Sequence, residues 1–240
     1  MSQLTHNNPS DRELDPHLTV GRDSWLITLV ALAHGFSHFY QLVLPPLFPF
    51  LVVSLDTSYT QLGLVLTVFG VASGLAQTPI GFLVDRFGGA AALIAGLGIL
   101  ALSVIGFAMA PNVWFLMGAA LLGGIANATF HPADYSILSA GVAPSRIGRA
   151  FSFHGVSGNI GWALAPLVML TLHAWVGLAM SFVVVGAAGL LAVAVLVINY
   201  RRLNQHVRRE QAGRAHDDER HRQANPGVKG EHHKWGKGPA

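Results

Sequence analysis

The chain has 240 residues, of which 52% are hydrophobic and 11% are charged, and its formal net charge is +3. Soluble domains carry about 25% charged residues, so this composition excludes an ordinary water-soluble fold and predicts a polytopic membrane protein. Cysteine is absent, which excludes disulfide bonds and thiolate metal sites.

The chain begins with a polar segment, residues 1–23, followed by a first membrane span predicted at Ser24–Val53. The polar segment lacks the basic start and short apolar core of a cleaved signal peptide, so we interpret it as an N-terminal tail. Three prolines are expected to break the outer end of the span. His34 and His38 are one helical turn apart and Gln41 follows three residues later, which makes one face of this span polar.

Spans 2 and 3 are predicted at Thr60–Val84 and Gly89–Ala110, around a short charged turn. Each is uncharged for roughly 20 residues, about the length that crosses a ~30 Å hydrocarbon core. One acid and one base between glycines indicate a helix–loop–helix corner at the membrane surface. The residues of this turn are Gly81, Asp85, Arg86 and Gly88.

Spans 4 and 5, predicted at Val113–Ala140 and Arg149–His173, contain several polar side chains. They are Asn127, His131 and Asp134 in span 4, and His154 and Asn159 in span 5. Asn127 and His131 are four residues apart and Asp134 follows three later, so these residues share one helix face. Asp134 is the only acidic or basic residue placed well inside any predicted span.

Asp134 and His154 each lie roughly 8 Å from the same-side ends of neighbouring spans, at ~1.5 Å per residue. At these depths the two side chains could meet. Ionisable groups within a bilayer usually face a partner or a cavity, and a carboxylate beside an imidazole can exchange a proton near neutral pH. Asp134 is thus the candidate proton-coupling residue. The alternative is that Asp134 is hydrated near the membrane surface and only caps its helix.

Span 6 is predicted at Val176–Tyr200 and is followed by a change in composition. Residues 201–240 contain ten of the fifteen Lys and Arg residues, together with five acids and few apolar side chains. Such a segment buries too little apolar surface to pack, so we expect a disordered tail whose first arginines contact anionic lipid. Apart from its basic residues, the tail has no feature that indicates a nucleic-acid partner, so none is expected.

The basic residues all fall on one side of the membrane if the chain crosses it six times. Outside the tail they are Arg12, Arg22, Arg86, Arg146 and Arg149. Basic residues accumulate on the cytoplasmic side, so both termini are predicted cytoplasmic and the protein is expected in the inner (plasma) membrane. The sequence therefore predicts an all-α fold with six transmembrane helices in residues 24–200.

The charged turn resembles the loop between helices 2 and 3 of major facilitator transporters. In that superfamily, helices 1 and 4 line a central cavity and helices 3 and 6 lie at the periphery, and the polar residues of this chain are distributed similarly. The triplet Phe130-His131-Pro132 and the pair Gly158-Asn159 resemble the fosmidomycin-resistance branch. The resemblance covers about residues 25–200.

The resemblance implies that the chain forms one six-helix half of a major facilitator fold. It also implies a transporter rather than an enzyme. Such a transporter would export a small organic solute in exchange for protons. Asp134 would couple to the proton, and the charged turn would gate the path. The family's basic pair after this turn is absent, which weakens the expected gating contacts. No cofactor is expected. The substrate path would be lined by His34, His38, Gln41, Asn127, His131, His154 and Asn159.

A metal site is a second interpretation, because two histidines four residues apart are good metal ligands. A metal site requires its ligands at one depth. At ~1.5 Å per residue, His34 lies about 14 Å in from Trp25, near the midplane, and Asp134 lies closer to the surface. We therefore predict no metal, with a metal carrier or intramembrane metalloenzyme left as the alternative. The candidate ligands are His34, His38, His131, Asp134 and His154.

The number of spans raises a further question, because major facilitator transporters normally contain two six-helix halves related by an axis along the membrane normal. That axis preserves orientation, so two copies of this chain can pair as a homodimer. Alternatively, the C-terminal half is missing from a truncated gene product. The chain would then be a non-transporting remnant or a regulatory partner of a full-length transporter. The sequence leaves these alternatives open, together with the solute and the direction of transport.

Overall fold

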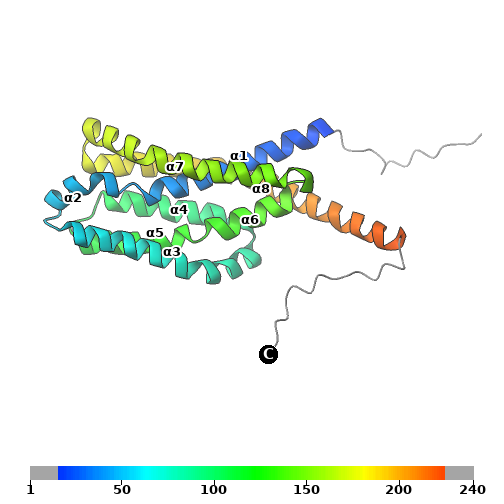
Figure 1. Cartoon of the computed structure of the whole chain (residues 1–240), viewed down its shortest axis with the longest axis horizontal. Coiled ribbons are helices and arrows are strands. Elements are labelled where there is room, and N and C mark those ends of the chain that lie inside the picture. Colours follow the sequence, from blue (N-terminus) through cyan, green and yellow to red (C-terminus); the bar gives the residue numbers. More distant parts are fainter. Residues whose placement is uncertain (1–15, 225–240) are drawn as a thin grey trace, which may run out of the picture.

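The computed structural model describes residues 16–224, and every regular element in that range is a helix (Figure 1). In chain order the elements are α1 (Pro16–Gln41), η2 (Pro45–Leu47), α2 (Phe48–Ser54), α3 (Tyr59–Phe87), α4 (Gly89–Phe107), α5 (Val113–Asn127), α6 (Phe130–Gly141), η3 (Pro144–Arg146), α7 (Ile147–Val176) and α8 (Leu178–Ala224).

Six helical stretches are long and apolar enough to cross a membrane. They are Asp23–Ser54, Tyr59–Phe87, Gly89–Phe107, Val113–Gly141, Pro144–Val176 and Leu178–His216. The predicted all-helical fold with six membrane spans is therefore confirmed. Helix α1 begins and helix α8 ends at the same end of the bundle (Figure 1), which we call the terminal end.

Local sequence signals explain where several helices begin and end. Prolines interrupt the first span as predicted, since α1 ends at Gln41 and α2 begins only at Phe48. At the start of α3, the Ser58 hydroxyl accepts a hydrogen bond from the Gln61 N–H, and the Gln61 side chain bonds back to the Ser58 N–H. Gly88 ends α3 with φ at +90°, a backbone conformation that favours glycine.

The fourth span is divided into two helices, which differs from the sequence prediction of one continuous helix. Helix α5 ends at Asn127 and α6 begins at Phe130. Pro132 has no N–H to bond the carbonyl four residues earlier. At the break the Thr129 N–H donates instead to the Ala126 carbonyl, which tightens the turn. The break therefore lies between the polar residues Asn127 and His131.

Glycines bring pairs of helices into close contact. The pairs α1 and α7, α3 and α5, and α4 and α8 each pack together. A Cβ atom at Gly161 of α7 would overlap the Gly35 carbonyl oxygen of α1, and one at Gly124 of α5 would overlap the Phe69 carbonyl oxygen of α3. By contrast, a Cβ at Gly155 meets nothing within 4 Å. Small residues at such contacts let helix backbones approach closely within a membrane.

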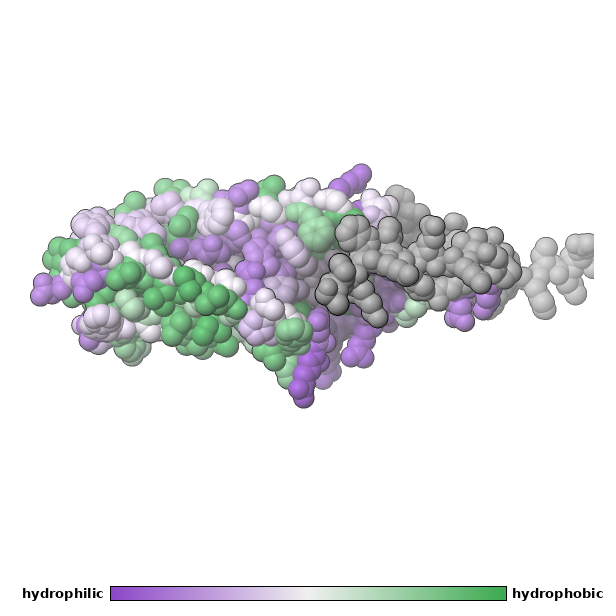
Figure 2. Space-filling model, turned by 60° about the horizontal axis from the view of Figure 1, so that its bottom comes forward, coloured by the Kyte–Doolittle hydropathy of each residue, from purple (hydrophilic) through white to green (hydrophobic). Residues whose placement is uncertain are grey.

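The surface matches a bundle that is embedded in lipid. Apolar side chains cover much of the bundle, and hydrophilic ones gather toward the terminal end (Figure 2). Exposed large apolar residues occur on most of the long helices, among them Leu75 on α3 and Ile198 on α8. In water such a surface would be unfavourable, whereas lipid chains solvate it.

Helix α8 continues past the expected end of the last span at Tyr200 and reaches Ala224. Residues 201–224 are therefore helical, which differs from the predicted disordered tail, while residues 225–240 lie outside the described residues. His206 Nε2 lies 2.9 Å from the Gly141 carbonyl oxygen, and Arg214 donates to the Ser139 and Val142 carbonyl oxygens. The extension is rich in Arg, Gln, Glu and Ala, which are good helix formers, and its Leu203 and Val207 pack against the bundle core.

A buried ion pair joins α1 to the connection between α6 and α7 at the terminal end. Asp23 is 2% exposed, and its Oδ2 lies 2.6 Å from Arg146 Nη2 and 2.7 Å from Arg146 Nε. The Ala143 N–H donates to the same oxygen over 3.4 Å, and His206 Nε2 is 3.8 Å from Oδ1. Asp23 was predicted to belong to the polar N-terminal tail, and this contact was not predicted.

Replacing Asp23 with alanine is expected to lower the free energy of unfolding by about 2 kcal/mol, because the partly buried Arg146 loses its charged hydrogen-bond partner. Replacing Glu219, an exposed acid on α8, is the matched control and is expected to change it by less than about 0.5 kcal/mol. Unfolding of both variants in detergent measures the difference. Equal stabilities would show that the Asp23–Arg146 pair does not hold this end together.

Candidate functional site

The centre of the candidate site is Asp134 on α6, which is fully buried. Its Oδ2 lies 3.0 Å from His34 Nδ1 of α1 and 3.0 Å from His154 Nε2 of α7. Three separate spans therefore converge on one carboxylate oxygen. The predicted meeting of Asp134 and His154 is present in the structure, and the hydrogen bonds of Asp134 run to side chains and not to a helix end.

The contact between His34 and Asp134 corrects the sequence argument that placed them at different depths. That argument counted 1.5 Å per residue from assumed helix ends and treated the helices as parallel. Helix α6 is a separate short helix after a break, so the count does not apply to it. The depth objection to a metal site consequently fails for His34, Asp134 and His154.

Two further histidines complete a group that we call the histidine cluster, namely His34, His38, His131 and His154 around Asp134. The His34 ring stacks on His154 with 3.5 Å between centroids, and its centroid is 4.4 Å from His38 and 5.6 Å from His131. Three buried atoms of the cluster have no hydrogen-bond partner among the described residues: His38 Nδ1, His131 Nδ1 and Asp134 Oδ1. The cluster therefore has unused donors and acceptors for a ligand or a proton.

A second polar network, centred on Asn127 of α5, lies further along α1. The Asn127 Oδ1 accepts from Ser37 Oγ over 2.9 Å and from Gln41 Nε2 over 3.5 Å, and Asn127 Nδ2 donates to Ser73 Oγ of α3 over 2.9 Å. Trp162 of α7 donates to Gln41 Oε1 over 3.3 Å. The predicted residues Gln41 and Asn127 thus belong to one polar network that joins four helices.

Ser73 and Trp162 are site residues that were not predicted from the sequence. Trp162 packs against His38 with 4.4 Å between ring centroids, so it joins the network of Asn127 to the histidine cluster. In the structure Ser73 is a buried polar residue on α3, and this burial is the one signal that points to a hydrogen-bond partner. Asn159, predicted to line the path, is exposed on α7 and forms no hydrogen bond within the described part of the chain.

The predicted gating turn lies at the terminal end, beside helix α6 (Figure 1). Asp85 and Arg86 are exposed, and neither forms an ion pair with any side chain that the structure describes. The Arg86 guanidinium instead lies 5.4 Å from the centre of the Phe87 ring. At Gly81 a Cβ would meet nothing within 4 Å, whereas Gly88 is needed for its positive φ. Among the described side chains, Arg86 therefore has an aromatic neighbour and no acidic partner.

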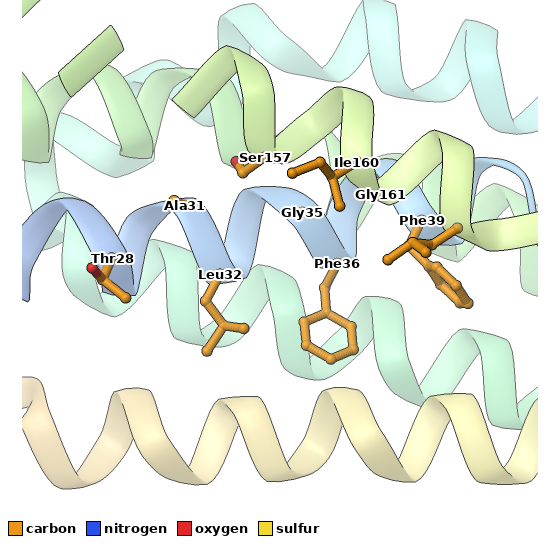
Figure 3. Close-up of a pocket in the computed structure, with 10 residues that line it drawn as sticks. Thr28, Ala31, Leu32, Gly35, Phe36, Phe39, Ser157, Ile160 and Gly161 are labelled. Atoms are coloured by element: carbon orange, nitrogen blue, oxygen red, sulfur yellow. The ribbon is translucent and has the colours of Figure 1, made fainter. Parts of the chain in front are cut away.

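An apolar cavity of about 380 Å³ lies between α1 and α7 and contains none of the predicted site residues. Figure 3 shows it bordered by Leu32 and Phe36 of α1 and by Ile160 of α7. Its lining offers almost no polar atoms to a ligand. This cavity is therefore separate from the histidine cluster and the Asn127 network.

Comparison with known proteins supports a transporter fold. The family model for the Major Facilitator Superfamily matches residues 30–236. The chain is 30% identical over 143 residues to the uncharacterised MFS-type transporter YfnC of Bacillus subtilis, covering 60% of this chain and 35% of that protein. It is 28% identical over 171 residues to the fosmidomycin resistance protein of Escherichia coli, covering 71% and 42%.

A third relative is a homologue of the multi-drug resistance efflux pump PmrA from Lactococcus lactis, 30% identical over 135 residues and covering 56% of this chain and 33% of that protein. Among solved structures, a bacterial homologue of the human lysosomal transporter Spinster, in an inward-facing and occupied conformation, matches with a TM-score of 0.65 at 19% identity. The match covers 74% of this chain and 44% of that one. The chain thus spans less than half the length of each of these proteins.

Proposed function

The chain belongs to the Major Facilitator Superfamily, a family of membrane transporters, and on that premise we propose that it exports a small organic solute in exchange for protons. The superfamily and the six spans make it an integral membrane protein with half of the superfamily's usual helix number. The inner (plasma) membrane is its proposed location. Relatives named for fosmidomycin resistance and multi-drug efflux support export.

The observation that carries the proposal is the buried contact of Asp134 with His34 and His154. An ionised Asp134 accepts a hydrogen bond from each ring, whereas a protonated Asp134 has one O–H to donate, so proton binding must rearrange the three partners. The partners belong to α1, α6 and α7. A change at one carboxylate is thereby transmitted to three membrane spans, as a coupled carrier requires.

The polar residues beside the proton site are proposed to contact the solute. His38 and His131 have unpartnered buried nitrogens, and Gln41 links the Asn127 network to Trp162. Ring faces and amide groups together suit an organic molecule that has both apolar and polar parts. A few such polar groups on an otherwise apolar path fix the orientation of a bound molecule.

The charged turn is proposed to act as the gate, working against a second six-helix unit. Asp85 and Arg86 are exposed at the terminal end and form no ion pair with the other described side chains. A partner helix whose N-terminus faces Asp85 would supply the missing attraction. The second unit is either another copy of this chain or a separate half.

The alternative function is that of a non-transporting remnant or a regulatory partner of a full-length transporter. The observation in its favour is that the chain spans 35% of YfnC and 42% of the fosmidomycin resistance protein. The two functions differ in one measurable property, which is solute movement by this chain in the absence of any other transporter.

Fosmidomycin is a suitable first probe, because one relative is named for resistance to it. In bacterial cells that lack their own fosmidomycin exporter, expression of the chain is expected to lower the amount of compound inside the cell. A proton uncoupler should remove the difference. Equal amounts with and without the chain, repeated with other compounds that multi-drug pumps export, would favour the non-transporting alternative.

The orientation of the chain can be tested with single cysteines, because the natural sequence has none. Ser145, within η3 at the terminal end, and Ser54, at the end of α2 on the opposite side, are both exposed. A membrane-impermeant thiol reagent added to intact cells is expected to label Ser54→Cys and spare Ser145→Cys. The reverse result would place the basic residues outside, against the cytoplasmic preference of Lys and Arg.

A further inference from the structure

The histidine cluster has the composition and spacing of a metal site. One nitrogen from each of His34, His131 and His154 lies within 4.8 Å of one from the other two. We propose that these three residues bind a divalent transition-metal ion of the zinc type. In a tetrahedral zinc site with Zn–N distances near 2.1 Å, ligand nitrogens are about 3.4 Å apart, so only small side-chain movements are needed.

Asp134 is placed to orient two of the ligands. Metal-binding histidines commonly donate their other ring N–H to a carboxylate, which fixes the tautomer and strengthens the ligand. His34 and His154 face the same oxygen of Asp134 through one nitrogen each, at 3.0 Å in both cases. The second nitrogen of each ring then carries the lone pair that an ion requires. The carboxylate also supplies a negative charge that offsets that of the ion.

His131 completes the set from the same helix as Asp134. Its Nδ1 is buried and has no hydrogen-bond partner among the described residues, and the same holds for His38 Nδ1 close by. Buried polar atoms in a native protein almost always have a partner, and a missing ion is one explanation when they do not. Three histidine ligands leave a fourth position for water or for His38, as in zinc sites that exchange ligands.

The electrostatic surroundings favour a cation. No Lys or Arg occurs between residues 23 and 85 or between residues 87 and 145, and Arg149, the one Lys or Arg residue of α7, is exposed near the start of that helix. Imidazole is a preferred ligand of zinc, copper, iron and nickel, whereas magnesium and calcium prefer oxygen. The site is therefore assigned to the nitrogen-preferring ions, and zinc is the probe of choice because it undergoes no redox change.

The test is equilibrium zinc binding to the purified full chain in detergent. His216, His221, His232 and His233 near the C-terminus could also bind zinc, so the reference protein carries glutamine at these four positions. This reference is expected to bind one zinc ion per chain in competition with a zinc-sensitive dye. In the same background, H131Q is expected to weaken binding more than about 100-fold, and D134N by about 10- to 100-fold as an orienting residue.

His173→Gln is the matched control, since His173 is on α7 near Phe50 and also has a buried unpartnered Nδ1. It should bind zinc as the reference does. Helix content and melting temperature verify that each variant is folded, and His131 is suited to replacement because it is only partly buried. Absence of stoichiometric zinc in the folded reference, or equal loss in H131Q and H173Q, would overturn the proposal.

The binding measurement is independent of transport, so the two proposals can fail separately. Zinc binding without solute movement would leave the metal site standing and remove the proposed function. Solute movement by a protein that binds no zinc would support the proposed function and overturn the metal site. If both hold, ion binding and protonation of Asp134 oppose each other, because a protonated Asp134 donates its O–H to one ring and no longer accepts from both ligand histidines.

Discussion

Replacing Asp134 with asparagine is expected to abolish transport driven by a pH gradient and to leave the fold intact. Asparagine has nearly the same shape and keeps one oxygen to accept a hydrogen bond from His34 or His154, but it cannot gain or lose a proton. Loss of a positioned proton-transfer group reduces rates by about 100-fold or more. Solute-dependent proton movement in inverted membrane vesicles, followed with a pH-sensitive dye, measures the effect.

The matched control for this variant is Asp56→Asn. Asp56 is exposed in the connection between α2 and α3, and its φ of +47° is a conformation that asparagine tolerates. This control should retain driven transport at the level of the natural chain. Undiminished driven transport in the Asp134 variant would remove the carboxylate from the coupling mechanism.

Replacing Gly161 with alanine is expected to lower the free energy of unfolding by about 1 to 3 kcal/mol. The added methyl group would overlap the carbonyl oxygen of Gly35, which is backbone and can move aside only if α1 and α7 separate. These two helices carry His34 and His154, so the same change is expected to weaken their shared contact with Asp134 and to reduce transport. The midpoint of thermal unfolding in detergent measures the stability.

Gly155→Ala provides the control on the same helix. An added Cβ at Gly155 has open space around it, and alanine is the better helix former, so its stability should be unchanged or slightly raised. If the Gly161 and Gly155 variants unfold at the same temperature, close approach of α1 and α7 does not limit stability. A normal midpoint with lost transport in the Gly161 variant would instead indicate movement between these helices.

The membrane fold could be predicted from sequence because its signals are local. Uncharged stretches of membrane-spanning length, separated by prolines, glycines and charges, identify spans without knowledge of tertiary contacts. The meeting of Asp134 and His154 followed from similar distances to the ends of neighbouring spans. The polar contact between Asn127 and Gln41 also joined residues that had already been assigned to one path.

The remaining features depend on tertiary contacts, which the spacing of apolar and polar residues along the sequence does not predict. The contact of His34 with Asp134 requires the relative placement of α1 and a short helix α6 that follows a break. Pro132 was visible in the sequence as the cause of such a break. The ion pair of Asp23 with Arg146 spans more than 120 residues of sequence, and charge patterning alone placed both groups at the membrane surface. The helical extension after Tyr200 was missed because apolar content is a poor measure of helix propensity.

The most direct test of the central claim is reconstitution of the purified 240-residue chain into liposomes that contain no other protein. With an imposed pH gradient and fosmidomycin as the first solute, the natural chain is expected to move solute faster than protein-free liposomes, with protons flowing in the opposite direction. The Asp134→Asn chain should match the protein-free liposomes. Solute movement by the natural chain no faster than that of protein-free liposomes, across the range of compounds that multi-drug pumps export, would contradict a proton-coupled exporter.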